Sequence, residues 1–155
     1  MPAASRSIVI DTPPDRLFDV IVDYDRYVEF LPEVKEAKSF NRRGNEVDVA
    51  YGIDVVKRIH YTLHHVEERP RAVRWSFVKG ELMRDNHGSW TLEPTPDGKT
   101  RATYTIEVGV GPLVPRSIVN ALVDQSLPKL LEAFKKRAES RERGGGLRGG
   151  PQALQ

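Results

Sequence analysis

The order of the predicted segments constrains the fold of this chain more than any other feature. Residues 8–10 predict a short apolar strand, and residues 13–31 predict two short helices that end at Pro32. Only strands follow, until one long amphipathic helix closes the chain. A single helix beside a sheet must bury its apolar stripe on one face of that sheet. The residues between them then form either a packed core or the lining of a cavity.

Most of the chain alternates between apolar and polar residues, which predicts strands with one face turned to water. Turn signals separate these segments, and Asp97-Gly98 is typical of a tight hairpin. Residues 34–43 alternate poorly, so the predicted antiparallel sheet has six to seven strands. The clearly alternating segments are residues 47–53, 59–64, 73–78, 88–92 and 102–108.

The last element is predicted as one helix from Pro115 to Ala138, with apolar residues at i, i+3, i+4 and i+7. Pro128 falls inside it and predicts a kink, because proline lacks the N–H of a helical hydrogen bond. After Ser140 the composition changes to glycine and arginine. We therefore expect one domain over residues 1–140 and a disordered Gly/Arg-rich tail over residues 141–155.

The segment from Thr12 to Pro32 resembles a known superfamily. Its pattern is Thr12-Pro13, Leu17-Phe18-Asp19-Val20, and then Tyr27 to Pro32 in the form Tyr-x-x-Phe-Leu-Pro. This pattern is similar to the START-like, or polyketide-cyclase-like (SRPBCC), superfamily, in the branch of coenzyme-Q-binding START proteins, ribosome-association toxins and cyclase/dehydrase proteins. The resemblance covers residues 5–139. It implies an α+β helix-grip fold, in which a curved sheet wraps around one long C-terminal helix and encloses a hydrophobic cavity.

Composition excludes several classes of function. The chain has no cysteine, which excludes disulfides, thiolate catalysis and cysteine-based zinc sites. A net charge of +2, with 30% charged residues, gives no general argument for nucleic-acid binding. No apolar run is long enough to span a membrane, and residues 1–6 lack the apolar core of a secretory signal. A cytoplasmic protein, peripheral to the membrane at most, is expected.

Inward-facing aromatic residues are the best candidates for a ligand site. Tyrosine and tryptophan carry polar groups that require partners when buried, whereas a solid core favours Leu, Val and Phe. A packed core is the alternative for each of them. The predicted cavity residues are Tyr51, Tyr61, Trp75, Phe77, Trp90, Tyr104, Leu122 and Ser126.

Further residues are candidates for the opening of the cavity and for catalysis. Arg84 and His87 are predicted as a polar rim, and Leu113 and Val114 as an apolar gate. Access is expected near residues 52–57, 80–87 and 109–116. The histidines do not converge, since neighbours in a strand such as His64 and His65 point to opposite faces, so no metal is expected. No catalytic motif appears, and no cofactor is expected.

Three functions follow from these observations and from the resemblance. The first is binding or carrying a hydrophobic small molecule such as a quinone, isoprenoid, lipid or polyketide-like compound, with a membrane surface or a lipid-metabolising enzyme as partner. The second is a polyketide aromatase/cyclase or dehydrase, which requires a buried acid–base pair. The third is a ribosome-associated regulator, which requires a continuous basic face. The ligand and the oligomeric state stay open.

Overall fold

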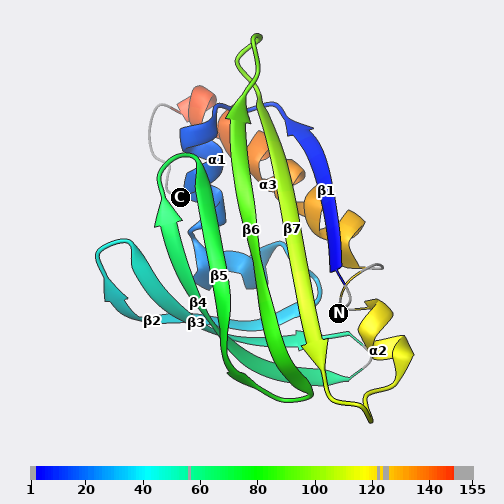
Figure 1. Cartoon of the computed structure of the whole chain (residues 1–155). Helices are drawn as coiled ribbons and strands as arrows, with labels where there is room; N and C mark the ends of the chain where they lie inside the picture. The colour runs from blue at the N-terminus through cyan, green and yellow to red at the C-terminus, as the bar shows by residue number, and fades with distance from the viewer. Residues whose placement is uncertain (1–2, 56, 122, 124–125, 149–155) are drawn as a thin grey trace.

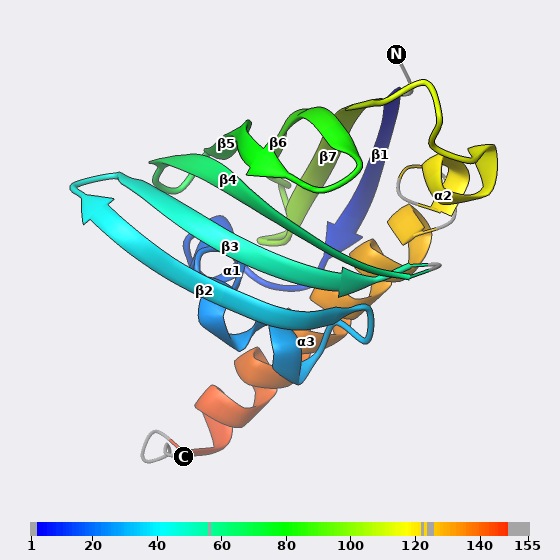
Figure 2. The same cartoon turned by 90° about the horizontal axis from the view of Figure 1, so that it is seen from below.

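The computed structural model describes residues 3–55, 57–121, 123 and 126–148, and it has the expected α+β helix-grip arrangement (Figures 1 and 2). Seven strands form one antiparallel sheet in the order β1-β7-β6-β5-β4-β3-β2. The sheet curves, and the helices α1 and α3 lie on its concave side (Figure 2). The strands are β1 Ala3–Ile10, β2 Val34–Arg43, β3 Glu46–Asp54, β4 Arg58–Glu68, β5 Ala72–Gly80, β6 Met83–Pro94 and β7 Thr100–Val110.

Each strand from β2 to β7 pairs with the next strand in sequence, so sequence order and sheet order agree except at the N-terminus. β1 pairs with β7, which brings the first strand to the far edge of the sheet. Gly98 has φ +84° and Gly44 has φ +60° in two of these turns. Glycine has no Cβ and adopts this left-handed conformation without strain. The hairpin predicted at Asp97-Gly98 is confirmed.

Two short helices follow β1, as the sequence predicts. α1 spans Pro14–Ile21, and the 3₁₀ helix η1 spans Tyr24–Glu29. Pro13 is extended and Pro14 takes the first helical position, where the missing N–H costs nothing. α1 buries its apolar side, and η1 turns Tyr24 and Tyr27 into the molecule. The short helices therefore deliver two tyrosines to the concave side of the sheet.

The C-terminal region differs from the prediction. Instead of one helix, α2 spans Arg116–Asn120 and α3 spans Ser126–Arg148, with π-helical backbone at Ala121 and Val123. Pro128 lies in the first turn of α3, where N–H groups have no partner within the helix. The kink predicted at Pro128 stays a prediction, because residues 124 and 125 lie outside the described residues. The hydroxyl of Ser126 donates to the carbonyl of Ala121. The irregularity therefore precedes Pro128.

α3 packs its apolar stripe against the concave side. The buried residues Leu127, Leu131, Phe134 and Ala138 recur every three or four positions and share one face. α3 also extends to Arg148, past the predicted end of the domain at residue 140; residues 149–155 lie outside the described residues. Among the described helices, none is long and apolar enough to cross a membrane.

Candidate ligand-binding cavity

A cavity of about 90 Å³ lies between the concave face of the sheet, η1 and α3. Aspartate, glutamate, lysine and arginine are absent from its described lining. The wall instead includes every tyrosine and both tryptophans of the chain. These residues are Tyr24, Tyr27, Tyr51, Tyr61, Trp75, Trp90 and Tyr104.

Seven of the lining side chains form a closed circuit of ring contacts, here called the aromatic ring. Neighbouring rings have centroids 4.6 to 6.0 Å apart, within the usual range for aromatic pairs. The circuit draws on η1, α3 and four strands, so it joins both layers of the fold. In order, its members are Tyr24, Tyr27, Phe134, Trp90, Tyr104, Trp75 and His65, which contacts Tyr24 again.

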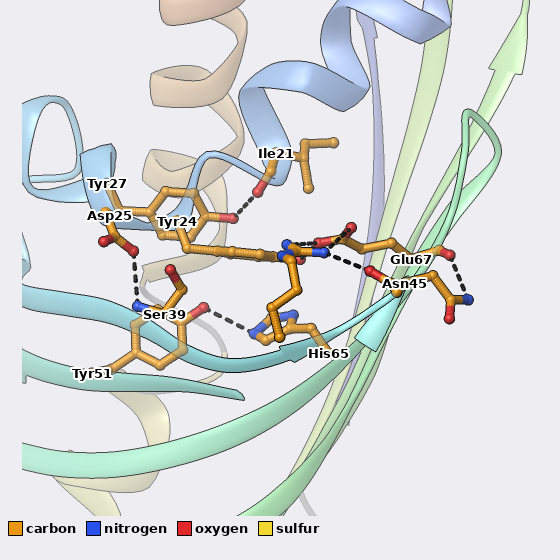
Figure 3. Close-up of polar contacts among 11 residues, drawn as sticks. Ile21, Tyr24, Asp25, Tyr27, Ser39, Asn45, Tyr51, His65 and Glu67 are labelled. Atoms are coloured by element: carbon orange, nitrogen blue, oxygen red, sulfur yellow. Dashed lines mark hydrogen bonds and ion pairs between the residues drawn. The ribbon is translucent and has the colours of Figure 1, made fainter. Parts of the chain in front are cut away.

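His65 is the most buried ionisable group of the cavity wall other than the tyrosines. Its side chain is 5% exposed, and its Nε2 lies 3.0 Å from the hydroxyl of Tyr51 (Figure 3). Burial lowers the pKa of His65 to about 3, with a smaller contribution from the neighbouring His64. The imidazole is therefore neutral at physiological pH. Its Nδ1 has no hydrogen-bond partner among the described residues.

Several other polar groups of the wall are held by the protein itself. Trp75 Nε1 donates to Asn86 Oδ1 at 3.0 Å, and Tyr27 donates its hydroxyl to the carbonyl of Ile21. Tyr24 donates to Glu67 Oε2 at 2.9 Å (Figure 3). The same carboxylate accepts from both terminal nitrogens of Arg42, at 2.9 and 3.1 Å. Arg42 also donates to the carbonyl of Gly44, so the bonds among Tyr24, Glu67 and Arg42 lie beside the β2–β3 turn.

The tyrosines of the wall carry no charge near neutral pH. Burial is the main cause of a raised pKa at Tyr27, Tyr51, Tyr61 and Tyr104. Together with the neutral His65, they line a space that offers hydrogen bonds and apolar surface. No group of the wall with a shifted pKa titrates close to pH 7, so the wall is suited to an uncharged molecule.

A second pocket, of about 170 Å³, adjoins the first. Both are lined by Leu31, Val34 and Leu130, which we call the neck. The outer pocket has polar groups that the inner cavity lacks, including Glu33 and Lys129. The two spaces together follow one path from the aromatic ring to the surface beside the start of α3.

The region predicted as the opening has a different structure. Ile118 of α2 and Val114 pack with Ile53, Ile59 and Leu82 in a second apolar cluster. Val34 and Tyr61, which line the inner cavity, also belong to this cluster. Leu113 is 95% exposed and takes no part in it. The loops near residues 52–57, 80–87 and 109–116 therefore meet over buried apolar contacts.

The structure brings five of the predicted cavity residues together on the inner wall: Tyr51, Tyr61, Trp75, Trp90 and Tyr104. Ser126 lines the outer pocket, whereas Phe77 packs against the edge of the core. Leu122 lies outside the described residues. Whether these residues bind a ligand stays a prediction.

The predicted polar rim is wrong in its placement. His87 lies on the convex face, with Nδ1 2.7 Å from Asp85 and Nε2 3.5 Å from Glu107. Arg84 is exposed beside Gly111 and does not line the cavity. The β6 residues that do face inward are Asn86 and Trp90, which share one parity.

Sequence reasoning missed His65, Asn86 and Tyr24 as wall residues. The alternation in β4 could have indicated His65, because Ile59, Tyr61 and Leu63 share its parity. Tyr24 carries no such signal, since its direction depends on the 3₁₀ geometry of η1. No group of His, Asp or Glu side chains that could hold a metal ion occurs among the described residues, which contain no cysteine.

Comparisons with solved structures place this geometry in a known fold. The Zhui aromatase/cyclase from Streptomyces sp. R1128 is similar over 94% of this chain and 98% of its own, at 16% identity and a TM-score of 0.86. A START superfamily protein from Mycobacterium smegmatis is similar over 89% and 97%, at 15% identity and a TM-score of 0.78. A STAR-related lipid transfer protein from Xanthomonas axonopodis is similar over 88% and 85%, at 16% identity and a TM-score of 0.73.

These identities are low, so the structural similarities show the fold alone. A search of the curated proteins finds no match. A family model described as "Polyketide cyclase / dehydrase and lipid transport" matches residues 1–139. The chain therefore belongs to the polyketide cyclase/dehydrase and lipid transport family.

Proposed function

We propose that this protein binds an uncharged hydrophobic small molecule inside the aromatic ring. The observation that carries the proposal is the composition of the wall: all tyrosines and tryptophans of the chain surround one cavity, and no described lining residue is an acid, a lysine or an arginine. Apolar surface that leaves water supplies the affinity, roughly 25 cal/mol per Å². A few polar groups fix the orientation of the ligand.

The ligand extends through the neck into the outer pocket. The two spaces, of about 90 and 170 Å³, stay below the roughly 300–1,000 Å³ that is usual for small-molecule sites even when taken together, so binding requires side chains to move. Leu31, Val34 and Leu130 separate them and carry only apolar side chains. A movement of these side chains joins the two spaces, so an elongated molecule occupies both, with its uncharged head group inside the aromatic ring and its chain in the outer pocket. Quinones, isoprenoids, other lipids and polyketide-like molecules all have this form.

A cyclase or dehydrase activity is the second candidate. The hydrogen bond between Tyr51 and His65 favours it, because it joins two proton-carrying side chains at the cavity wall. General acid–base catalysis is most efficient when the pKa of the group lies near the working pH. The pKa of His65, lowered to about 3, and the raised pKa of Tyr51 are both far from neutral. Binding is therefore the better-supported function.

The described surface gives less support to a ribosome-facing role. A basic face would be needed, but arginines on different elements pair with carboxylates, as in Arg42–Glu67, Arg69–Asp19 and Arg74–Glu68. Such pairs reduce the local positive potential that attracts RNA phosphates.

Calorimetric titration with uncharged and charged partners of equal length tests the proposal. We expect a long-chain alcohol or ketone to bind and the corresponding carboxylate to bind at least tenfold more weakly, since burying a charge in this wall is costly. The variant Leu63→Phe adds volume at the inner wall and should weaken binding. Val78→Phe makes a similar change at an exposed position of β5 and should not. Equal binding of both variants, or no saturable binding of any uncharged probe, would contradict the proposal.

A further inference from the structure

An open groove of about 900 Å³ lies beside α3, apart from the inner cavity. One wall comes from residues 128–140 of α3, and the other from Phe30 and Pro32 in the segment that joins η1 to β2. Phe30 is fixed from two sides, because its ring centroid lies 5.1 Å from that of Phe134 and 5.0 Å from the Arg137 guanidinium. The groove therefore has a preformed apolar floor.

Two lysines on the rim of this groove are available to an anion. Lys129 and Lys136 are exposed, and neither forms an ion pair with a described residue. Glu132, the one acidic residue in the described lining, is also exposed and forms no ion pair within the described part of the chain. Arg137 is already engaged, since its Nη2 lies 2.6 Å from Glu29 Oε1. The accessible charge of the rim is therefore positive.

The positive charge of the chain is concentrated in the segment that forms α3. Residues 126–148 contain seven lysines and arginines and three glutamates, a formal net charge of +4. Residues 1–125 contain 17 basic and 19 acidic residues, a formal net charge of −2. An approaching acidic molecule is therefore attracted to this segment and weakly repelled by the rest of the chain.

The composition of the groove distinguishes among three kinds of anionic partner. Among the described residues, none of the exposed large apolar side chains lines the groove, so it offers no anchor for insertion into a bilayer. A nucleic-acid base would stack on an aromatic face, but the Arg137 guanidinium already lies over the ring of Phe30. A protein helix with an apolar stripe and acidic flanks matches both the floor and the rim.

The length of the groove suits a short helix. Its α3 wall spans residues 128–140, about 18 Å at 1.5 Å per residue. Lys129 and Lys136 are seven residues apart, so they lie on one side of α3 and about 10 Å from each other along its axis. A partner helix of about three turns, with carboxylates two turns apart, can therefore pair with both lysines.

We propose that this groove is the docking site for an acidic amphipathic helix of a partner protein. The apolar stripe of the helix packs on Phe30, Pro32 and Ala133, and its carboxylates pair with Lys129 and Lys136. Pro32 and Lys129 also line the outer pocket, so the docked partner sits beside the opening of the path to the inner cavity. The docking does not depend on which molecule occupies that cavity.

A helical peptide of about 14 residues, with a leucine stripe flanked by glutamates and a lactam bridge that holds the helix, tests this by calorimetric titration. We expect the wild type to bind it about tenfold more tightly than the same peptide with glutamine in place of glutamate. Lys129→Glu/Lys136→Glu should weaken binding of the acidic peptide at least tenfold, because attraction becomes repulsion. Glu132→Gln removes the carboxylate of the rim and should tighten binding about twofold.

Lys57→Glu/Lys79→Glu is the matched control, because it makes the same change in net charge at exposed lysines outside the groove. Its affinity for the acidic peptide should stay within about twofold of the wild type, since salt screens distant charges. If both double variants lose binding equally, net charge alone attracts the peptide and the inference is wrong. It is also wrong if the acidic peptide does not bind, or binds no better than the glutamine peptide.

Vesicles of phosphatidylcholine and phosphatidylglycerol distinguish a protein partner from a bilayer. We expect both double variants to co-sediment with these vesicles to the same extent, because the groove offers no anchor for insertion. Sedimentation of the wild type that is lost in Lys129→Glu/Lys136→Glu and kept in Lys57→Glu/Lys79→Glu would assign the groove to an anionic membrane and overturn the proposal.

Discussion

The hydroxyl of Tyr51 and Nε2 of His65 lie 3.0 Å apart, and both side chains are less than one-tenth exposed. They come from neighbouring strands, β3 and β4, on the concave face. Tyr24 covers the imidazole from η1, with ring centroids 4.6 Å apart. A histidine enclosed in this way is costly to protonate, which links the stability of the fold to pH.

Acidification should therefore lower the stability of the protein through protonation of His65. Burial lowers the pKa of His65 to about 3, below the value near 6.5 in the unfolded chain. Between these values the unfolded state binds more protons, so the free energy of unfolding decreases as pH falls. From pH 7 to pH 4, the stability of the wild type should decrease by roughly 3 kcal/mol more than that of His65→Leu. Urea denaturation at several pH values measures this difference.

His64 provides the contrast, because it lies on the opposite face. Asp48, at 2.7 Å, and Glu46 raise the pKa of His64, so its contribution is present below pH 6.5 and is lost as pH rises through the folded-state pKa. The stability that His64→Gln loses relative to the wild type should therefore be largest below pH 6.5 and should shrink as pH rises. His65→Leu should instead gain stability relative to the wild type as pH falls. Parallel pH profiles for His65→Leu and the wild type would contradict the assignment of His65.

Removing the Tyr51 hydroxyl should destabilise the fold. Tyr51→Phe leaves both nitrogens of the His65 ring without a partner, at a cost of about 1–3 kcal/mol. Tyr61→Phe is the matched change on the next strand, and we expect it to alter stability by less than about 0.5 kcal/mol because its hydroxyl bonds to no described residue. Chemical denaturation separates the two; equal losses would mean that the Tyr51–His65 bond contributes little.

The neck should control access to the inner cavity. Val34→Trp places a large ring beside Leu31 and Leu130, and we expect ligand association to slow at least tenfold, or about 1.4 kcal/mol in barrier height. Stopped-flow mixing measures the rate. Leu113→Trp alters the residue that the sequence suggests as a gate, but Leu113 is 95% exposed and away from the neck. Slower association only in Leu113→Trp would show that the ligand enters beside Leu113 and not through the neck.

Truncation should show which part of the C-terminal helix contributes to the stability of the domain. Glu139 Oε2 accepts from the backbone N–H of Asp11 at 2.9 Å, and Arg137 pairs with Glu29 at 2.6 Å. A chain that ends after Ser140 keeps both contacts, so its Tm should stay within about 2 °C of the wild type. A chain that ends after Lys135 loses both, together with buried Ala138, and its Tm should fall by about 5 °C. A large decrease in the first variant would show that residues 141–155 contribute to stability.

Much of the fold follows from local periodicity. Strand alternation correctly predicts the inward side of Tyr51, Trp75 and Tyr104, because the side-chain period of a strand is two regardless of its neighbours. The same rule applied one residue further along β4 would have included His65. The prediction for His87 rests on the chemistry of its side chain, whereas strand parity places Asn86 and Trp90, and not His87, on the inward side of β6.

The other features of the fold depend on tertiary contacts, which the periodicity of the sequence does not predict. The change from α2 to α3 places a π-helical segment before Pro128, and an amphipathic pattern alone cannot distinguish this from one kinked helix. The packing at the predicted opening depends on Ile118 meeting Ile53 and Ile59, which are far apart in sequence. The neck arises in the same way, from Val34 at the start of β2 and Leu130 on α3.

The concentration of all five tyrosines and both tryptophans around one cavity also has an optical consequence. Almost all near-ultraviolet absorption of the protein arises in the cavity wall, and the convex face contributes almost nothing. Trp75, Tyr104 and Trp90 are in successive contact, so their transitions couple and their circular dichroism depends on their mutual angles. The protein thus carries a built-in spectroscopic reporter of its own interior, with little background from the rest of the fold.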